Sequence, residues 1–409
     1  MKMVSNMDKI IIIGGGPSGL TCAIKAKNDN NKVIVLEKNE VCGKKILVTG
    51  NGKCNYFNDN QDINNYNSNN KELLYKIINK ENISKVNSFF DELELVPKIK
   101  NGYYYPMSEQ ASSIRNILVN KVKEKQIQII TNCNVESIKK ENDKFIINTN
   151  NKVFECDKVV LATGSYAGVK NIENVNSYNI LKSFNLNIEN VLPTLVQLKG
   201  EANYFKEWDG VRVDANVKLY ENNNFIKEEN GQLQLTDYGV SGICVFNLSS
   251  DISRGLSINK KEELIIDFLP SIGDLNNYFD KRSRILGNYK IIDFLDGIIN
   301  IKLANTILNN NNIDRFKTYN DLSMIEKSNL IESIKSFKLN IVGTNDYYKA
   351  QTCTGGLDLE EINLSTMETN KVKGLYVIGE IIDIDGACGG YNLTISWLSG
   401  ILAGSDINA

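Results

Sequence analysis

The sequence predicts a mixed α/β protein whose main domain is assembled from both ends of the chain, with a β-rich and a helical segment between them. Three observations lead to this prediction. A β-branched strand leads directly into a glycine-rich turn near the amino terminus. A second strand followed by glycine and a carboxylate lies near the carboxyl terminus. Between them, short alternating strands give way to helical spacing of the apolar residues.

The composition limits the number of domains and the kind of partner. A chain of 409 residues suggests two or three domains of roughly 100–200 residues each. The 47 Lys and Arg residues nearly cancel the 49 Asp and Glu residues, so the charge gives no argument for nucleic acid or membrane as a partner. The apolar runs are shorter than the roughly 18–20 residues of a membrane span, and the start lacks a secretion signal. We expect a cytoplasmic protein that acts on a small molecule.

The residue types available for chemistry are unusual, because the chain has no histidine. A catalytic triad with a histidine base is therefore excluded, and proton transfer must use Tyr, Lys, Cys, a carboxylate, water or a cofactor. The eight cysteines are scattered without a C-x-x-C pair. This spacing disfavours a zinc site and a redox disulfide, so we expect no bound metal.

The first element is a strand followed by a glycine-rich turn and a helix. The β-branched run 9–13 is typical of a buried parallel strand, and the turn 14–19 has the sequence G-G-G-P-S-G. Residues 20–28 have helical spacing, and residues 32–37 form a second strand that ends in Glu37. This order of strand, G-x-G-x-x-G, helix, strand and acid predicts a Rossmann-type dinucleotide-binding domain.

Each position of this turn has a physical role. Gly14 permits a tight turn, Gly16 lets the backbone approach a pyrophosphate, and Gly19 lets the helix pack closely on the strand. The helix N-terminus offers free N–H groups to the phosphates. Glu37 can accept hydrogen bonds from ribose hydroxyls. The motif predicts a dinucleotide but does not separate FAD from NAD.

A second glycine-rich segment, residues 42–55, follows shortly after the second strand. Gly50 and Gly52 would let backbone amides approach a flat ligand closely. Lys44 and Lys45 could neutralise phosphate. The alternative is an ordinary surface loop, and Cys54 in this segment is either a proton donor or a buried, inert thiol.

The middle of the chain predicts insertions into the main domain. Residues 71–96 and 111–125 have helical spacing, residues 127–154 alternate as short strands, and residues 158–164 form another strand that ends in a small-residue turn. These elements still belong to the main domain.

The predicted main domain comprises residues 1–190 and 345–409. A β-rich, barrel-like domain spans 191–270, and a helical domain spans 271–344. The helical residues could form a nucleic-acid reader, but residues 271–340 hold 10 basic and 8 acidic residues without a basic stripe. We interpret them as a cap over a substrate cleft.

At the carboxyl end, a strand again delivers glycine and a carboxylate, Gly379 and Glu380, and the G-G-Y-N sequence 389–392 opens a helix. This geometry suits a second approach to one extended cofactor. Glu380 is followed by Asp383 and Asp385. Three acids without further ligands are more typical of hydrogen bonding to a polyol, or of a solvated loop, than of a metal site.

Nine ordered motifs together resemble a bacterial family of FAD flavoproteins that includes aminoacetone oxidase-like and 3-dehydro-bile-acid Δ4,6-reductase-like proteins. The resemblance covers nearly the whole chain. The motifs are GGGPSGL (14–20), GKKILVTGNGKCN (43–55), YYPMSEQAS (104–112), LATG (161–164), LPTLVQL (192–198), LTDYGVSG (235–242), CTGGL (353–357), TMETNKVKGLYVIGE (366–380) and GGYN (389–392).

The resemblance implies a discontinuous FAD-binding domain, like that of two-dinucleotide-binding-domain flavoproteins, with an inserted β-barrel and helical domain. By matching positions, it implies that the following residues contact FAD: Gly14, Gly16, Pro17, Ser18, Gly19, Glu37, Lys38, Lys44, Lys45, Thr49, Gly50, Gly52, Cys54, Asn55, Val135, Ala162, Thr163, Gly164, Gly379, Glu380, Gly390, Tyr391 and Asn392.

The chain also departs from the family at four positions. The family usually has Arg where this chain has Lys53 and Tyr103, His where it has Asp237, and Pro where it has Ile243. Recognition of the substrate on the barrel side can therefore differ.

The leading functional hypothesis is reduction of an activated C=C bond, with FAD taking hydride from NAD(P)H. Tyr104, Tyr105 and Tyr391 are candidate proton donors, although each could serve in packing instead. A second G-x-G-x-x-G motif, which would indicate a separate site for NAD(P)H, is not found. The most similar segment, residues 164–168, lacks the middle glycine. We therefore expect NAD(P)H to bind transiently at the flavin face. One alternative is an amine oxidase that uses O2, and another is a non-enzymatic flavin redox sensor or RNA-associated protein.

Overall fold

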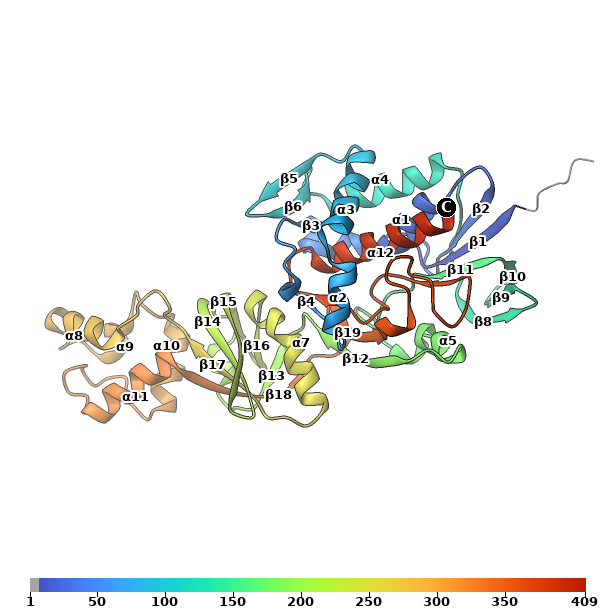
Figure 1. The fold of residues 1–409 in the computed structure, drawn as a ribbon. Coiled ribbons are helices and arrows are strands. Elements are labelled where there is room, and N and C mark those ends of the chain that lie inside the picture. Colours follow the sequence, from blue (N-terminus) through green and yellow to red (C-terminus); the bar gives the residue numbers. More distant parts are fainter. Residues whose placement is uncertain (1–6) are drawn as a thin grey trace, which may run out of the picture. The chain divides into compact units, whose positions relative to one another are not determined.

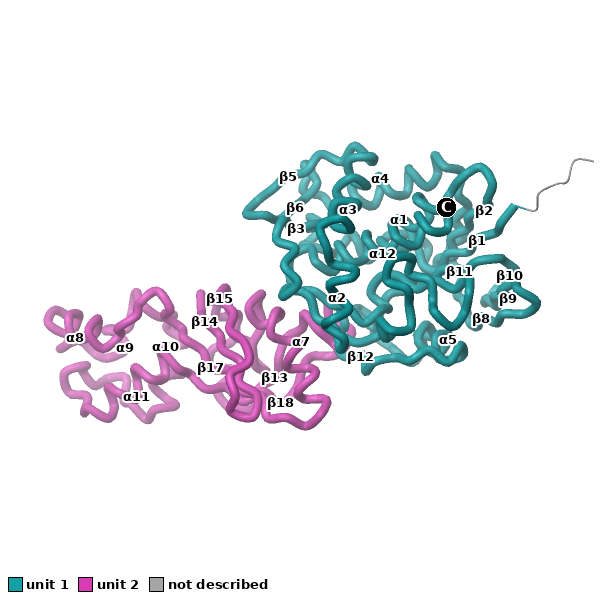
Figure 2. The backbone as a smooth tube through the Cα atoms, viewed as in Figure 1, with its two compact units in different colours: residues 1–192, 352–409 teal, residues 193–351 magenta. Residues whose placement is uncertain are grey.

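The computed structural model describes residues 7–409 and divides the chain into two compact units. One unit contains the chain up to Leu192 together with Thr352–Ala409, and the other contains Pro193–Gln351 (Figure 2). The first unit is therefore built from both ends of the sequence. Its two parts are joined within one sheet and one helix pair.

A parallel five-stranded sheet forms the centre of the first unit. Its order is β20 (Leu375–Val377), β11 (Lys158–Leu161), β1 (Asp8–Ile13), β2 (Asn31–Leu36) and β7 (Gln128–Ile130). All four strand pairs are parallel. The carboxyl ends of the strands therefore meet at one edge, where ligands bind in sheets of this kind. This arrangement confirms the Rossmann-type prediction.

Two helices, one from each end of the chain, pack against each other beside this sheet (Figure 1). They are α1 (Pro17–Ala26) and α12 (Tyr391–Asn408). Their backbones approach closely, since a Cβ on Gly400 would lie 2.5 Å from the Ser18 carbonyl oxygen. This packing fixes the carboxyl-terminal helix on the first one.

The remaining elements of the first unit surround the sheet. Residues 71–96 and 111–125, predicted as helical, contain three helices, and residues 127–154 contain short strands as expected. These three helices are α2 (Lys71–Ile77), α3 (Lys80–Glu92) and α4 (Ala111–Glu124), and a fourth helix, α5 (Ser177–Ser183), follows later in the chain. The antiparallel groups are β8 (Val135–Glu141), β9 (Lys144–Thr149) and β10 (Val153–Cys156); β3 (Phe57–Asn58), β6 (Tyr103–Pro106) and β5 (Pro97–Lys100); and β4 (Tyr66–Asn67) with β21 (Asp385–Gly386). Two further strands, β12 (Ile188–Thr194) and β19 (Thr352–Leu357), pair where the chain passes between the units.

The second unit contains a closed six-stranded barrel, which confirms the predicted β-barrel. In order around the barrel, the strands are β13 (Leu198–Gly200), β16 (Gly239–Gly242), β15 (Asn224–Thr236), β14 (Arg212–Glu221), β17 (Glu262–Asp267) and β18 (Phe337–Thr344). The helices of this unit are α6 (Phe205–Trp208), α7 (Ile243–Ser257), α8 (Leu275–Leu286), α9 (Ile291–Leu295), α10 (Ile301–Asn310) and α11 (Met324–Lys335).

Two segments differ from their predicted assignments. Residues 243–257, within the region 191–270 that was predicted as β-rich, form the helix α7. Residues 337–344, placed in the helical domain 271–344, form β18 and pair with β13 and β17. Phe337, Leu339 and Ile341 alternate with exposed residues and contribute to the barrel core. This period of two is the pattern of a half-buried strand. Because the strand directly follows a long helical region, the sequence pattern did not separate it from the helices. Within residues 7–409, no helix has the length and apolarity needed to cross a membrane.

Candidate functional site

The predicted cofactor residues lie mainly on five segments at the carboxyl edge of the parallel sheet and at the start of α12. They are Gly14, Gly16, Pro17, Ser18 and Gly19 after β1; Glu37 and Lys38 after β2; Lys44, Lys45, Thr49, Gly50, Gly52, Cys54 and Asn55 in the following loop; Ala162, Thr163 and Gly164 after β11; and Gly379, Glu380, Gly390, Tyr391 and Asn392 from β20 to α12. Val135 lies at the start of β8, where it is buried.

The turn between β1 and α1 has glycines of two kinds. Gly14 has a φ of +108°, and a Cβ there would lie 2.2 Å from the Ala162 carbonyl oxygen. A Cβ on Gly19 would lie 1.9 Å from the Gly14 carbonyl oxygen. By contrast, a Cβ on Gly16 would have no neighbour within 4 Å. The chain's own packing requires Gly14 and Gly19, whereas the space beside Gly16 is open.

The N-terminus of α1 is suited to an anion. Gly16 is the N-cap and supplies no side-chain hydrogen bond, Pro17 follows it, and the first turn holds no acidic residue. The first N–H groups of a helix have no partner within the helix and carry a partial positive charge. They can therefore bind the pyrophosphate of a dinucleotide.

Glu37 anchors this turn to the end of β2. Its Oε2 accepts a hydrogen bond from the Gly15 N–H at 2.7 Å, and its Oε1 accepts bonds from the Asn39 backbone and side-chain N–H groups at 2.8 and 2.6 Å. A carboxylate offers about four acceptor positions, so these bonds leave about one for a ribose hydroxyl. The buried Glu37 therefore shapes the turn as well as offering a cofactor contact.

Two buried polar atoms in the predicted site have no hydrogen-bond partner among the described residues. They are the Asn55 Oδ1 and the Thr163 Oγ1. A Cβ on Gly390 would lie 3.1 Å from the Asn55 Oδ1. A Cβ on Gly14 would lie 3.2 Å from the backbone N of Thr163. A buried polar atom without a partner costs about 1–3 kcal/mol. Both atoms are therefore available to hydrogen-bond a polar ligand.

The loop after β2 contains the 3-10 helix Ile46–Gly52. Within it, the Thr49 Oγ1 donates to the Ile46 carbonyl oxygen at 2.7 Å. Cys54 is fully buried, and burial raises the pKa of its thiol to about 11. Of the two interpretations of Cys54, the structure favours the inert buried thiol, because a proton donor must reach the substrate.

The lysines of the same region differ in their partners. Lys38 and Lys44 are exposed. The Lys45 Nζ lies 2.5 Å from the Glu380 Oε2, which also accepts a bond from the Ser165 Oγ at 3.4 Å. The sequence predicts that Lys45 neutralises phosphate and that Glu380 hydrogen-bonds to a polyol or is solvated. In the structure the two side chains form an ion pair with each other.

The side chain of Asn392 holds the turn before α12. Its Oδ1 accepts a hydrogen bond from the Gly386 N–H at 2.8 Å, and its Nδ2 donates to the Gly386 carbonyl oxygen at 2.7 Å. A cofactor would therefore contact Asn392 through its backbone. Gly390 is the N-cap of α12 with a φ of +96°, and a Cβ there would lie 2.9 Å from the Phe57 carbonyl oxygen.

Asp383 is part of a structural contact. Its Oδ2 accepts hydrogen bonds from the Ser68 Oγ at 3.1 Å and the Asn69 N–H at 2.7 Å. These bonds, together with the pairing of β21 with β4, tie residues 66–69 to the segment before α12. No group of three or more Cys, Asp or Glu residues suited to a metal occurs within residues 7–409.

The three candidate tyrosines do not all lie together. Tyr104 donates from its hydroxyl to the Asp59 Oδ1 at 2.7 Å, and this bond raises the pKa of Tyr104 to about 12. Side chains alternate along a strand, so Tyr105 points to the other face of β6. Burial raises the pKa of Tyr105, whose neighbours include Cys388. Burial also raises the pKa of Tyr391 to about 12. Tyr105 and Tyr391 therefore lie near the start of α12, whereas Tyr104 is bonded elsewhere.

Three contacts that support the site carry no recognisable sequence signal. The Asn58 Nδ2 donates to the Gly389 carbonyl oxygen at 3.0 Å, and the Trp397 Nε1 donates to the Tyr56 carbonyl oxygen at 2.9 Å. The Arg115 Nε donates to the Cys42 carbonyl oxygen at 2.8 Å. Each joins residues more than 70 positions apart, so only the fold brings them together.

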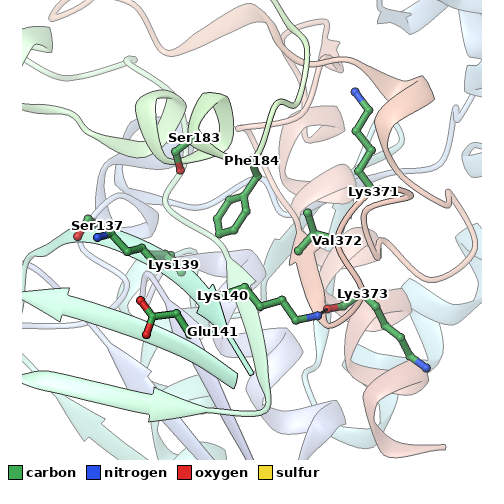
Figure 3. A pocket seen from close by; sticks show the side chains of 10 residues that line it. Ser137, Lys139, Lys140, Glu141, Ser183, Phe184, Lys371, Val372 and Lys373 are labelled. Carbon is green, nitrogen blue, oxygen red and sulfur yellow. Dashed lines mark hydrogen bonds between the residues drawn. The ribbon is translucent and has the colours of Figure 1, made fainter. Parts of the chain in front are cut away.

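A groove of about 840 Å³ lies elsewhere in the first unit (Figure 3). It is lined by Ser137, Ile138, Lys139, Lys140, Glu141, Ser183, Phe184, Lys371, Val372 and Lys373. The Lys140 Nζ donates to the Lys373 carbonyl oxygen at 2.7 Å. Residues 371–373 precede β20, so they belong to the amino edge of the sheet. The groove is therefore separate from the glycine turns at the carboxyl edge.

Comparisons with known proteins agree with this geometry. Residues 8–406 match the family model described as the HI0933-like protein Rossmann domain. The chain is 34% identical over 402 residues to the 3-dehydro-bile acid delta(4,6)-reductase of Clostridium scindens, covering 97% of this chain and 98% of that one. It is 27% identical over 410 residues to the ribosomal RNA dihydrouridine synthase of Escherichia coli, covering 98% of each.

Solved structures show the same fold. The 3-ketosteroid-delta4-(5alpha)-dehydrogenase of Rhodococcus jostii RHA1 aligns with a TM-score of 0.50 and 12% identity, over 100% of this chain and 99% of that one. The 3-ketosteroid delta1-dehydrogenase of Sterolibacterium denitrificans aligns with a TM-score of 0.50 and 11% identity, over 98% and 99%. The family match and the curated relative that is 34% identical support FAD as the cofactor. The chain belongs to the HI0933-like Rossmann family of FAD-dependent oxidoreductases.

Proposed function

We propose that this oxidoreductase reduces a carbon–carbon double bond conjugated to a carbonyl group in a small molecule. One observation carries the proposal: the relative that is 34% identical over 97% of the chain is named as a reductase of such a bond in a bile acid. The second relative supports the same chemistry, since its name denotes production of dihydrouridine. Uridine also has a double bond conjugated to a carbonyl group.

FAD would supply the hydride chemistry, with NAD(P)H as the proposed transient reductant. The chain's residues would hold and orient it. The N-terminus of α1 would bind the diphosphate, Glu37 a ribose hydroxyl, and Asn55 and the backbone at the start of α12 the flavin. The turns after β1 and β2 lie at one edge of the parallel sheet. The unpartnered Asn55 Oδ1 and Thr163 Oγ1 support the same site. Pre-positioned groups of this kind speed a reaction by fixing the orientation of its partners.

Tyr105 is the proposed proton donor to the carbon next to the carbonyl. Tyr105 is half-buried, which is compatible with contact between its side chain and a substrate. The raised pKa keeps this hydroxyl protonated at neutral pH. Tyr104 is bonded to Asp59, and Tyr391 is buried with 6% exposure. These differences support Tyr105 over the other two candidates.

Anaerobic reduction of the flavin tests the direction of the reaction. The purified protein is mixed without oxygen with NADPH, NADH or a small amino ketone, and flavin absorbance is followed. We expect NADPH or NADH to bleach the flavin. If the nicotinamide and an enone substrate use one site in turn, steady-state kinetics with both should give parallel double-reciprocal lines. Rapid bleaching by the amine alone would instead support an amine oxidase.

A uridine in RNA is the second candidate substrate, because the dihydrouridine synthase aligns with the chain over 98% of its length. The net charge of −2 argues against it, since phosphate contacts by Lys and Arg dominate affinity for RNA. Incubation of the reduced enzyme with transcribed ribosomal RNA, followed by mass spectrometry of nucleosides, would detect dihydrouridine. Its formation would favour RNA over a small molecule.

A further inference from the structure

The ion pair of Lys45 and Glu380 joins two segments that are 335 residues apart in the sequence. Their side chains are only partly exposed, at 40% and 21%. Ser165, in the turn after β11, donates to the same carboxylate oxygen. The pair therefore connects the loop after β2, the turn after β11 and the turn after β20 at the carboxyl edge of the sheet.

This pair lies beside the helix end suited to the diphosphate. Glu380 directly follows Gly379, and a Cβ on Gly379 would lie 2.4 Å from the Ser18 Oγ in the first turn of α1. An uncompensated carboxylate here would repel an anionic diphosphate, and the repulsion would be stronger than in bulk water because the region is partly buried. The ammonium group of Lys45 removes this repulsion only if it stays paired with Glu380.

We propose that Lys45 is the fixed counter-charge of Glu380, and that it aids FAD binding by cancelling this carboxylate rather than by binding a phosphate oxygen. The inference rests on FAD as the cofactor but not on the substrate or the direction of the reaction. It assigns Lys45 a positioning and charge-balancing role. A lysine that bound phosphate directly would act independently of Glu380.

Three variants test the proposal through the dissociation constant of FAD, measured by fluorescence quenching on titration with the full-length apoprotein. Lys45→Met leaves Glu380 uncompensated, so FAD should bind about tenfold more weakly, the factor that corresponds to ~1.4 kcal/mol. Glu380→Gln removes the repulsive charge, so binding should be unchanged or tighter. The double variant Lys45→Met/Glu380→Gln should bind within about threefold of the wild type.

Lys32→Met is the matched control, because Lys32 is an exposed lysine near the amino end of β2. Lys32→Met also removes one positive charge, but at the end of β2 away from the site. It should leave the dissociation constant of FAD unchanged. The proposal is overturned if Lys45→Met has no effect, or if the double variant stays as weak as Lys45→Met, which would indicate a direct phosphate contact. Circular dichroism of each apoprotein separates a loss of folding from a loss of binding.

If Lys45→Met does not fold, Glu380→Gln alone decides the question. Retained or tighter FAD binding would support a repulsive role for the carboxylate. A loss of about tenfold or more would overturn it, because Glu380 would then contribute a hydrogen bond that outweighs repulsion. If neither the wild type nor any variant binds FAD, the assignment of FAD as the cofactor is wrong. This result is distinct from a failure of the Lys45 proposal, in which the wild type still binds FAD.

Discussion

The glycines of the first turn illustrate how similar residues serve different purposes. Gly14 and Gly19 are needed because a Cβ would collide with backbone atoms of the chain itself, whereas a Cβ on Gly16 would meet nothing within 4 Å. The φ of Gly16 is −80°, which any residue adopts. The chain itself therefore does not require glycine at position 16, and we predict that the cofactor does.

Gly16→Val should consequently abolish FAD binding and leave the apoprotein folded. Its circular dichroism and its unfolding midpoint without FAD should match those of the wild type. Gly14→Val is the contrasting variant, because its φ of +108° and the 2.2 Å approach to Ala162 should disrupt folding itself. A yellow, fully loaded Gly16→Val protein would show that this turn does not bind the pyrophosphate.

Tyr105→Phe should slow proton transfer and leave reduction of the flavin unchanged. The loss of a general acid typically lowers the rate of substrate reduction by about 10²–10⁴-fold. Stopped-flow absorbance would measure the two half-reactions separately. Tyr104→Phe is the matched control from the next position of β6, since its hydroxyl is bonded to Asp59. Equal effects of the two substitutions on substrate reduction would remove Tyr105 as the donor.

At the residue scale, the sequence could predict positions whose role depends on local spacing. The glycines after β1, Glu37 after β2 and the small residues after β11 occur where their motifs placed them. The partners of Lys45 and Asn392 could not be predicted in this way. Lys45 pairs with a residue 335 positions away, and the Asn392 side chain forms a pair with Gly386 that depends on the geometry of one turn.

At the scale of elements, the boundary of the barrel was the hardest feature to predict. The helices and strands of the first unit follow clear periods of 3.6 and 2 residues. β18 follows four helices, and it joins the barrel only by pairing with β13 and β17, which lie far earlier in the chain. Its alternation of buried residues was present in the sequence, but nothing local separated it from the helices before it.

A buried carboxylate at the start of β17 predicts that the stability of the second unit depends on pH. Glu262, at the start of β17, is 1% exposed, and neither carboxylate oxygen has a hydrogen-bond partner among the described residues. Burial and then the nearby Glu221 raise its pKa from 4.5 to about 7, while Lys260 opposes this and Asp251 adds to it. The folded state therefore holds a proton that the unfolded chain releases between about pH 4.5 and 7.

Because the folded pKa is above the unfolded one, Glu262 should lower the stability progressively as pH rises through this window. The loss is on the order of 1–3 kcal/mol at pH 7 and above. Glu262→Gln should remove this pH-dependent loss of stability. In urea unfolding at pH 8 the variant should therefore have a higher midpoint than the wild type, and the difference should be smaller at pH 4.5. An equal midpoint of the two proteins at pH 8 would contradict the raised pKa.

At the scale of the whole molecule, FAD binding should stabilise the unit that contains both ends of the chain. The predicted cofactor residues lie within residues 14–164 and 379–392, all in this unit. A ligand that binds only the folded state adds about 4 kcal/mol at a thousandfold excess over its Kd. FAD added to apoprotein should raise the melting temperature of this unit. The Gly16→Val protein should show no such shift, and an unchanged wild-type midpoint at saturating FAD would be incompatible with this site.

The measurement that tests the central claim most directly is a single turnover of the reduced enzyme without oxygen. The flavin is reduced, excess reductant is removed, and an enone is added while flavin absorbance and product mass are followed together. The account predicts that the yellow colour returns with formation of one product, heavier than the enone by two hydrogen atoms, for each flavin oxidised. A flavin that stays reduced with a range of enones and is reoxidised only when oxygen is admitted would contradict the proposed reduction of a conjugated double bond.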